Sequence, residues 1–289
     1  MTLDVAVVIP AFNAAAFLPA ALNSLRAQTV PPKEVVVVDD GSTDETASIA
    51  RANGATLVQQ QQRGPGAARN RGIQVTKAPL IAFLDADDWF APNKLERQCE
   101  RLSQLGVAAC CTGALVVEQD RVTRSKNAGH VVPEILTFER LLKGNPVICS
   151  SMLLRRDALL RSGVFDEDPL LIATEDYDLW LRIVRNEPIA YLAEPLTFYR
   201  VHQNSLSANT RFLRGIDRIM DKVSALPGAD PREKRQIALR RADARLDLAW
   251  DLVQATGRAR EARGLIRESL GHAVTWKGCR MWLRSLIGG

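Results

Sequence analysis

The 289-residue sequence predicts an α/β fold in which helices flank a mainly parallel sheet, followed by a helical tail. Four short apolar runs, at 5–9, 35–38, 55–58 and 80–84, lack alternation of polar and apolar residues, and helical segments separate them. Strands with this pattern are buried on both faces, as in parallel sheets covered by helices. From residue 209 onward the chain is rich in Arg and Ala, with apolar residues at helical spacing, which predicts the tail.

The first part of the sequence alternates strands and helices. Pro10 ends the first β-branched run, and Gly54 is suited to end the second helix. In chain order we expect a strand at 5–9, a helix at 15–27, a strand at 35–38, a helix at 44–53, a strand at 55–58, a loop at 64–66, a helix through Arg69 and Gly72, and a strand at 80–84.

The next part is more varied. We expect a helix at 92–104, strands at 107–112 and 115–118, a polar surface loop at 121–133, a strand at 151–154, helices at 156–162 and 175–185, a change of character after 196–201 and then roughly three tail helices. The helix at 175–185 begins with Glu175, Asp176 and Asp178. Carboxylates in a first turn are favoured by the helix dipole alone, so a structural role for them stays open.

The run Leu80 to Asp88 ends in three carboxylates, which a buried strand would not keep inside without partners. Side chains of an extended segment repeat every second residue, so Asp85 and Asp87 are expected to point the same way. Two carboxylates on one face suit a hard divalent cation that also binds phosphate. The alternative is a solvated acidic turn after a strand.

Polar residues follow the carboxyl ends of several predicted strands. They are Pro10, Asn13, Asp39, Asp40, Asp85 and Asp87. In open α/β sheets ligands bind at this edge, so the sequence predicts a ligand site there.

Composition narrows the class of protein. With 46% hydrophobic and 25% charged residues, the chain has ordinary globular composition, and no apolar stretch is long enough to cross a bilayer. The N-terminus lacks the charged leader and long apolar run of a signal peptide. Five cysteines without a CxxC pair indicate neither a zinc site nor a disulfide framework and favour a reducing cytoplasm.

Charge is unevenly divided along the chain. Residues 1–204 carry 21 basic and 24 acidic side chains, a net charge of −3. Residues 205–289 carry 17 basic and 9 acidic side chains, a net charge of +8. The excess of positive charge therefore belongs to the predicted tail.

Six motifs in order resemble glycosyltransferase family 2, the inverting enzymes of GT-A fold. They are Val7-Val8-Ile9-Pro10-Ala11-Phe12-Asn13, Val38-Asp39-Asp40-Gly41-Ser42-Thr43-Asp44, Gly66-Ala67-Ala68-Arg69-Asn70, Asp85-Ala86-Asp87, Glu175-Asp176 and Tyr199-Arg200-Val201-His202. The resemblance spans residues 5 to about 205. It implies a GT-A domain at 1–205, Rossmann-like with a mixed but mainly parallel sheet, whose nucleotide-binding half is about 1–112 and acceptor-binding half about 113–205. Residues 206–289 would form a basic helical region.

The resemblance also implies roles for individual residues. Asp176 would be the catalytic base, Asp87 and His202 would face a Mn²⁺ or Mg²⁺ ion, and Asp85 would face the ribose and sugar. The nucleotide-sugar site would comprise Pro10, Ala11, Phe12, Asn13, Asp39, Asp40, Arg69, Asp85, Ala86, Asp87, Glu175 and Arg200. A guanidinium such as that of Arg69 suits charged oxygens because it stays protonated and donates in a fork.

Three departures from the family pattern matter. Ala15 stands where many members carry Glu, and Phe12 replaces the commoner Tyr, so a polar contact and a hydroxyl are lost. The Gln-x-x-Arg-Trp element of processive synthases is missing, and residues 199–202 occupy that region. Addition of one sugar per encounter is therefore expected.

We thus expect a metal-dependent inverting transferase. It would move one sugar from a nucleoside-diphosphate sugar, with UDP favoured, to a hydroxyl of a saccharide or lipid-linked acceptor in bacterial-type cell-surface glycan synthesis. A mobile loop around 199–209 would exclude water. The alternative is a non-catalytic sugar-nucleotide-binding or scaffold module. Gly64 to Arg69 partly imitates the fingerprint of a dinucleotide-binding protein, but the third glycine of that motif is missing. Phe83 to Asp87 imitates the first motif of an aspartyl-phosphate phosphohydrolase, but Trp89 stands where that motif would have a small β-branched residue.

The basic tail has two expected partners. Amphipathic helices of net charge +8 could dock on anionic lipid, where a lipid-linked acceptor is presented, or could form a homodimer. We expect no nucleic-acid partner. The expected location is the cytoplasm, peripheral at the inner face of the membrane if the tail binds lipid.

Overall fold

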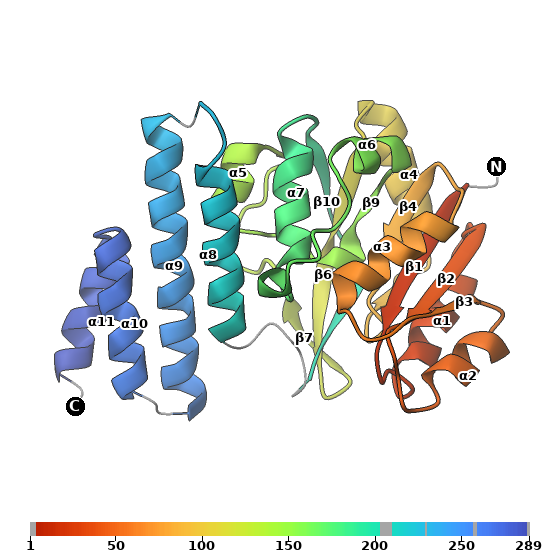
Figure 1. Cartoon of the computed structure of the whole chain (residues 1–289), viewed down its shortest axis with the longest axis horizontal. Helices are drawn as coiled ribbons and strands as arrows, with labels where there is room; N and C mark the ends of the chain where they lie inside the picture. Colours follow the sequence, from red (N-terminus) through yellow and green to blue (C-terminus); the bar gives the residue numbers. More distant parts are fainter. Residues whose placement is uncertain (1–3, 203–209, 229, 257–258, 288–289) are drawn as a thin grey trace. The chain divides into compact units, whose positions relative to one another are not determined.

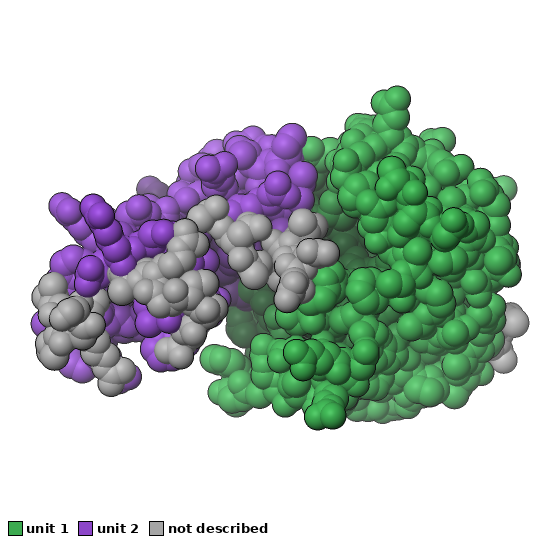
Figure 2. All heavy atoms as spheres, turned by 90° about the horizontal axis from the view of Figure 1, so that it is seen from below, with its two compact units in different colours: residues 1–141, 145–167, 175–205 green, residues 142–144, 168–174, 206–289 purple. Residues whose placement is uncertain are grey.

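The computed structural model describes residues 4–202, 210–228, 230–256 and 259–287. The chain forms two compact units, coloured separately in Figure 2. The first comprises residues 1–141, 145–167 and 175–205 and holds the sheet. The second comprises 206–289 together with two short segments, 142–144 and 168–174. Most of the loop expected to exclude water, 203–209, lies outside the described residues.

The first unit is a sheet with flanking helices (Figure 1). Its strands are β1 (Val5–Ala11), β2 (Glu34–Asp39), β3 (Thr56–Gln59), β4 (Leu80–Phe83), β5 (Trp89–Phe90), β6 (Ala109–Glu118), β7 (Arg121–Ser125), β8 (Ile135–Leu136), β9 (Leu153–Arg155) and β10 (Ile189–Val201). Its α-helices are α1 (Leu18–Arg26), α2 (Thr46–Ala52), α3 (Pro65–Val75), α4 (Lys94–Leu105), α5 (Phe138–Leu142), α6 (Arg156–Arg161) and α7 (Glu175–Val184). Two 3₁₀ helices, η1 (Cys149–Ser151) and η2 (Pro169–Leu171), interrupt the chain.

The sheet order is β3-β2-β1-β4-β9-β6-β10-β5, with β7 on β6 and β8 on β10. Strands β3, β2, β1 and β4 are parallel to one another, and β6 is parallel to β10. The short strand β9 is antiparallel to both β4 and β6, which joins the two parallel sets. The prediction of an α/β fold with a mixed, mainly parallel sheet is therefore confirmed.

The parallel strands are apolar throughout because helices cover the sheet. Val5, Val7 and Ile9 of β1 are fully buried in one core with Leu18 and Leu22 of α1. Helix α3 crosses β1 closely at Gly72, where a Cβ atom would lie 2.3 Å from Cγ1 of Val8. Glycine is therefore required at this crossing.

Several local predictions were wrong. The region 121–133 was expected to be a loop, but Arg121–Ser125 forms β7, an edge strand paired with β6. All five residues of β7 are exposed, so no apolar periodicity marks it. The two strands expected at 107–112 and 115–118 are one strand, β6, and the strand β10 was not predicted.

Two further boundaries differ from expectation. Helix α3 begins at Pro65 inside the predicted Gly-Pro-Gly loop, because Gly64, with φ of +93°, turns the chain and proline is accepted at a first helical position. Residues expected to start a strand at 151 instead complete η1, and β9 begins at Leu153.

The tail part of the second unit, residues 206–289, contains four α-helices among its described residues, one more than the three expected: α8 (Thr210–Ser224), α9 (Pro231–Thr256), α10 (Ala259–His272) and α11 (Trp276–Ile287). In α8 the buried residues Ile216, Ile219, Met220 and Val223 follow the spacing of one helix face. Among the described helices, none combines the length and apolar character that a membrane span requires.

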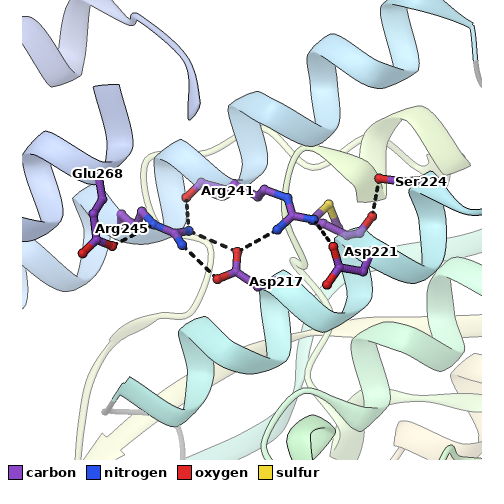
Figure 3. A network of polar contacts seen from close by, with 7 residues as sticks. Asp217, Asp221, Ser224, Arg241, Arg245 and Glu268 are labelled. Atoms are coloured by element: carbon purple, nitrogen blue, oxygen red, sulfur yellow. Dashed lines mark hydrogen bonds and ion pairs between the residues drawn. The ribbon is translucent and has the colours of Figure 1, made fainter. Parts of the chain in front are cut away.

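Polar contacts link three of these helices (Figure 3). Asp217 of α8 accepts hydrogen bonds from Arg241 at 3.2 Å and from Arg245 at 2.9 Å, both on α9. Arg241 also binds Asp221 at 2.7 Å, and Arg245 reaches Glu268 of α10 at 3.3 Å. Two basic side chains of α9 are thus paired with acids inside the unit.

Candidate active site

The polar residues predicted at the sheet edge do lie at neighbouring strand ends. Ala11 pairs with Asp39, and the amide of Asp40 donates to the carbonyl of Ala11 at 2.8 Å. On the other side of β1, the amide of Leu84 donates to Val8 at 3.1 Å, which leads directly into Asp85. The carboxyl ends of β2, β1 and β4 therefore bring both acidic motifs to one edge.

The loop after β1 is joined to the loop after β2. Asn13 adopts a left-handed conformation with φ of +48°. Its amide donates to Ser42 Oγ and its side-chain oxygen accepts from the amide of Thr43, each at 2.9 Å. Phe12 is 46% exposed, so its ring is free to meet a ligand. Asn13 shapes the loop that presents Phe12.

Asp39 and Asp40 are both buried but have different surroundings. Asp40 accepts from the amides of Arg63 and Gly64 at 2.9 and 2.8 Å, and so caps the start of α3. Asp39 accepts from the amide of Ser42 and the side chain of Gln59. Both carboxylate oxygens of Asp40 therefore already accept hydrogen bonds within the protein. A nucleotide contact from Asp39 or Asp40 stays a prediction.

Arg69 on α3 connects residues more than 100 positions apart. Its side chain is 5% exposed and donates to Glu175 Oε1 at 2.7 Å and to Asp85 Oδ1 at 2.6 Å. The guanidinium also lies over the aromatic ring of Phe165, with its carbon 5.2 Å from the ring centroid. Arg69 Nε and Glu175 Oε2 are buried without a hydrogen-bond partner in the part of the chain that the structure describes. A ligand or water that supplied partners would lower the cost of these unpaired groups.

Asp176 lies beside this pair at the start of α7. Burial, followed by the charge of Glu175, raises the pKa of Asp176 to about 7. Arg69 and the amide of Tyr177 act in the opposite direction, and Asp85 adds to the rise. A carboxylate with a pKa near neutrality is suited to accept a proton at neutral pH.

Asp87 contacts His202. The distance from Asp87 Oδ2 to His202 Nε2 is 3.0 Å. Burial and the neighbouring Asp85 raise the pKa of Asp87, and the contact with His202 opposes this. The imidazole stacks on Phe17, with ring centroids 5.1 Å apart, which fixes its orientation.

One carboxylate and one imidazole fit a Mn²⁺ or Mg²⁺ ion in part. Such ions bind through one or two carboxylates and take further oxygens from substrate phosphates and water. In the described residues no group of three or more His, Cys, Asp or Glu side chains is arranged to hold a metal by itself. Asp87 and His202 would therefore need ligands from the substrate or solvent.

Arg200 is held in a stack of aromatic rings. Its guanidinium lies 5.2 Å from the ring of Phe17 and 4.9 Å from that of Trp89. It donates to the carbonyl of Asp87 at 3.2 Å and forms an ion pair with Asp120. Arg200 thus holds the Asp87 loop, and direct contact with a nucleotide sugar stays a prediction. Trp89, Phe198 and Arg200 also line an open pocket of about 570 Å³.

Two residues not predicted for the site support the acidic loop. Ser150 is fully buried, accepts from the amide of Asp85 at 2.9 Å and donates to Asp88 Oδ2 at 2.6 Å. The other oxygen of Asp88 accepts from the amide of Arg200 at 2.9 Å. Asp88 could have been suspected as the third acid of its run, whereas a lone serine gives no local signal. The neighbouring Cys149 is buried, which raises the pKa of its thiol well above the usual value.

Comparison with known proteins supports the same assignment. The model of the family described as "Glycosyl transferase family 2" matches residues 6–163, more than half of the chain. Over 211 residues the chain is 28% identical to "UDP-Glc:alpha-D-GlcNAc-diphosphoundecaprenol beta-1,3-glucosyltransferase WfgD" of Escherichia coli, covering 71% of this chain and 80% of WfgD. Matches to four curated relatives cover 64% to 82% of those proteins.

Solved structures share the fold. TarS of S. aureus, residues 1–349 in complex with UDP-GlcNAc, superposes with a TM-score of 0.71 at 19% identity, covering 94% of this chain and 80% of that one. The mannosyltransferase PcManGT of Pyrobaculum calidifontis, in complex with GDP-Man and Mn²⁺, superposes with a TM-score of 0.66 at 19% identity. The match covers 99% of this chain and 80% of the PcManGT chain. The family match and the names of these relatives support an enzyme. The chain belongs to glycosyl transferase family 2 and is a glycosyltransferase.

Proposed function

We propose that the protein transfers one sugar, with inversion, from a nucleoside-diphosphate sugar to a hydroxyl of a saccharide or lipid-linked acceptor in bacterial cell-surface glycan synthesis. The observation that carries this proposal is the juxtaposition of Asp176, whose pKa is about 7, with Glu175, Arg69 and Asp85 at the strand edge. A base poised near neutrality, in one cluster with the acidic loop, supports direct attack by an acceptor hydroxyl.

The residues divide the work as follows. Asp176 would accept the proton of the attacking hydroxyl, and Arg69 would keep Glu175 and Asp85 in place beside it. Asp87 and His202 would hold Mn²⁺ or Mg²⁺, which as a Lewis acid would offset charge on the leaving diphosphate. The buried Cys149 has a raised pKa and is a poor nucleophile, which supports a single displacement over a covalent intermediate.

The donor and acceptor classes are drawn from the relatives. UDP is favoured because WfgD is named for UDP-Glc and TarS binds UDP-GlcNAc. A divalent metal is supported by the Mn²⁺ complex of PcManGT. Phe12 would lie against the base, with Pro10, Ala11, Asn13 and Asp39 completing that end of the site. The acceptor would lie over the half formed by residues 113–205.

The basic helical region would bind either an anionic lipid surface or a second copy of the chain. Five cysteines are free, which supports a reducing cytoplasm. On the helices α9 and α11, Trp250 is 52% and Trp276 81% exposed. Exposed tryptophans on basic helices support peripheral contact with anionic lipid, with dimerisation as the alternative.

A transfer assay with Mn²⁺ tests the proposed function. Asp176→Asn is expected to lower kcat by ~10²–10⁴-fold, the usual contribution of a general base, while nucleotide binding persists. UDP with Mn²⁺ is expected to raise the melting temperature of the wild type but not of Asp87→Ala, because a ligand of the folded state stabilises it. Asp157→Asn, an exposed acid in the first turn of α6, is the matched control and should change neither result.

The proposal has a clear contrary outcome. If the wild type transfers no sugar from a broad panel of nucleoside-diphosphate sugars while still binding nucleotides, the chain does not perform this reaction. Equal activity of Asp176→Asn and wild type would remove Asp176 as the base.

A further inference from the structure

Lys126 is a cation at the active site that the sequence did not mark. It directly follows β7 and is exposed, and its amide donates to the carbonyl of Ala114 at 2.8 Å. Strand β7 pairs with β6, and β6 pairs with β10, in a register that sets Val116 opposite Tyr199. The ammonium of Lys126 lies 4.9 Å from the centroid of the Tyr199 ring. The hairpin thus brings Lys126 to the strand that carries Arg200.

Two acids of the site act electrostatically on Lys126. Much of the Lys126 side chain is exposed, but protein atoms crowd its ammonium end; this local burial and the neighbouring Arg124 lower the pKa of Lys126, whereas Asp176 and Asp88 raise it. Across the described ranges, no carboxylate lies within ion-pair distance of Lys126, Arg124 or Arg121. These three exposed cations occupy one short edge of a unit whose net charge is negative.

An ammonium group with no carboxylate at ion-pair distance among the described residues is suited to bind an anion. Lysine offers three donors on a flexible stem and is a common ligand of phosphate. A purely structural lysine would be expected to form an ion pair with one of the acids near it. Lys126 instead rests on an aromatic ring, so its donors remain available to a substrate.

We propose that Lys126 binds a phosphate group of the acceptor, so that the enzyme favours a glycosyl phosphate or diphosphate over a neutral sugar. This inference rests on the proposed function. Lys126 follows β7 and lies over the ring of Tyr199, within the half of the chain assigned to the acceptor, whereas the donor diphosphate is assigned to Asp87 and His202. Arg124 adds positive charge on the same side. The phosphate could otherwise belong to the donor, and the experiment must distinguish the two sources.

Steady-state kinetics with two acceptors make this distinction. One acceptor is a sugar linked through diphosphate to a short alkyl chain, and the other is the neutral alkyl glycoside of the same sugar. Lys126→Ala is expected to reduce kcat/KM for the diphosphate acceptor about tenfold more than for the neutral one, because a hydrogen bond between two charged groups is lost only with the diphosphate. Lys126→Arg should restore most of this preference, and the KM for donor should stay close to the wild-type value.

A binding measurement tests the same residue without turnover. Octyl diphosphate is titrated calorimetrically into the full chain and into each variant. We expect about tenfold weaker binding to Lys126→Ala, and wild-type binding to Arg121→Ala, which removes the same charge from the other end of β7. Failure of all transfer would count against the proposed function but would leave this measurement able to support Lys126.

Three results would overturn the proposal. The first is an equal loss of kcat/KM for both acceptors. The second is a raised KM for donor with the KM for acceptor unchanged, which would assign the phosphate to the donor. The third is identical binding of octyl diphosphate to wild type and Lys126→Ala.

Discussion

At the scale of single residues, Arg69 has the widest influence on the site. It contacts a carboxylate on the loop after β4 and another on α7, and it is almost fully buried. Removing one partner of a buried ion pair is costly because the remaining charge is left uncompensated. Arg69 therefore couples the geometry of the acidic loop to that of Asp176, whose pKa it also lowers.

The raised pKa of Asp176 predicts the pH dependence of transfer. Activity should rise with pH through about 7 and level off above it, because the base must be ionised. Glu175→Gln should shift this rise in activity to lower pH. The substitution removes a charge that raises the pKa of Asp176 and also frees more of the Arg69 charge to lower it. Lys126 and Asp85 also face the group and are left unchanged. The measurement is the pH profile of kcat at saturating substrates.

The Glu175 variant can give the opposite result. A limb that stays in place, or moves to higher pH, would show that Asp176 does not set the pH dependence. The position of the pH profile should be compared, not the absolute rate, because Glu175 also forms an ion pair with Arg69.

At the scale of elements, the crossing of α3 over β1 sets the position of Arg69. The crossing is close because Gly72 has no side chain, and Val8 occupies that space. Three residues before Gly72, Arg69 begins the connection to α7. Packing of one helix on one strand thus determines where the guanidinium lies.

Gly72→Ala is expected to destabilise the fold. Its Cβ would lie 2.3 Å from Val8 Cγ1, and overpacking of this kind costs about 1 to 3 kcal/mol. The better helix propensity of alanine offsets about 1 kcal/mol at most. Denaturant unfolding is the measurement, and the double variant with Val8→Ala should recover part of the loss. Gly66→Ala in the same helix is the control, since its Cβ would make ordinary contacts of 3.5 Å or longer. Equal stability of Gly72→Ala and wild type would contradict the required close approach.

At the scale of the whole molecule, the helical unit combines a net positive charge with exposed large apolar side chains. Its net charge is +8, yet part of this charge is neutralised by Asp217 and its neighbours. Trp250 and Val253 lie three residues apart on α9, and Trp276 and Leu283 lie seven apart on α11, so each pair shares a helix face. All four side chains are more than 40% exposed.

The exposed tryptophans predict binding to anionic vesicles. The full chain should co-sediment with vesicles containing a third anionic phospholipid at low salt, and should be released as salt screens the attraction. Trp276→Ser should weaken binding about tenfold, from the loss of buried apolar area. Val131→Ser is the control, because Val131 is also exposed but belongs to the sheet unit. Absence of sedimentation at low salt, with a concentration-dependent mass in light scattering, would favour the dimer.

The sequence by itself determined the buried parallel strands, the helices between them and the acidic motifs at strand ends. These follow from local patterns: unbroken apolar runs such as that of β1, and polar residues placed directly after them. The edge strand β7 was not predicted, because all its residues are exposed and it is defined by its pairing with β6. An exposed edge strand carries no periodic signal.

Only the tertiary structure decided which predicted residues act on one another. The sequence could place Arg69, Asp85 and Glu175 on three separate elements, but the ion pairs among them depend on packing across more than 100 residues. The same holds for Ser150 beside Asp88 and for Lys126 over the ring of Tyr199. Single polar residues have no pattern that reports a distant partner, because hydrogen bonds and charges act between neighbours in space.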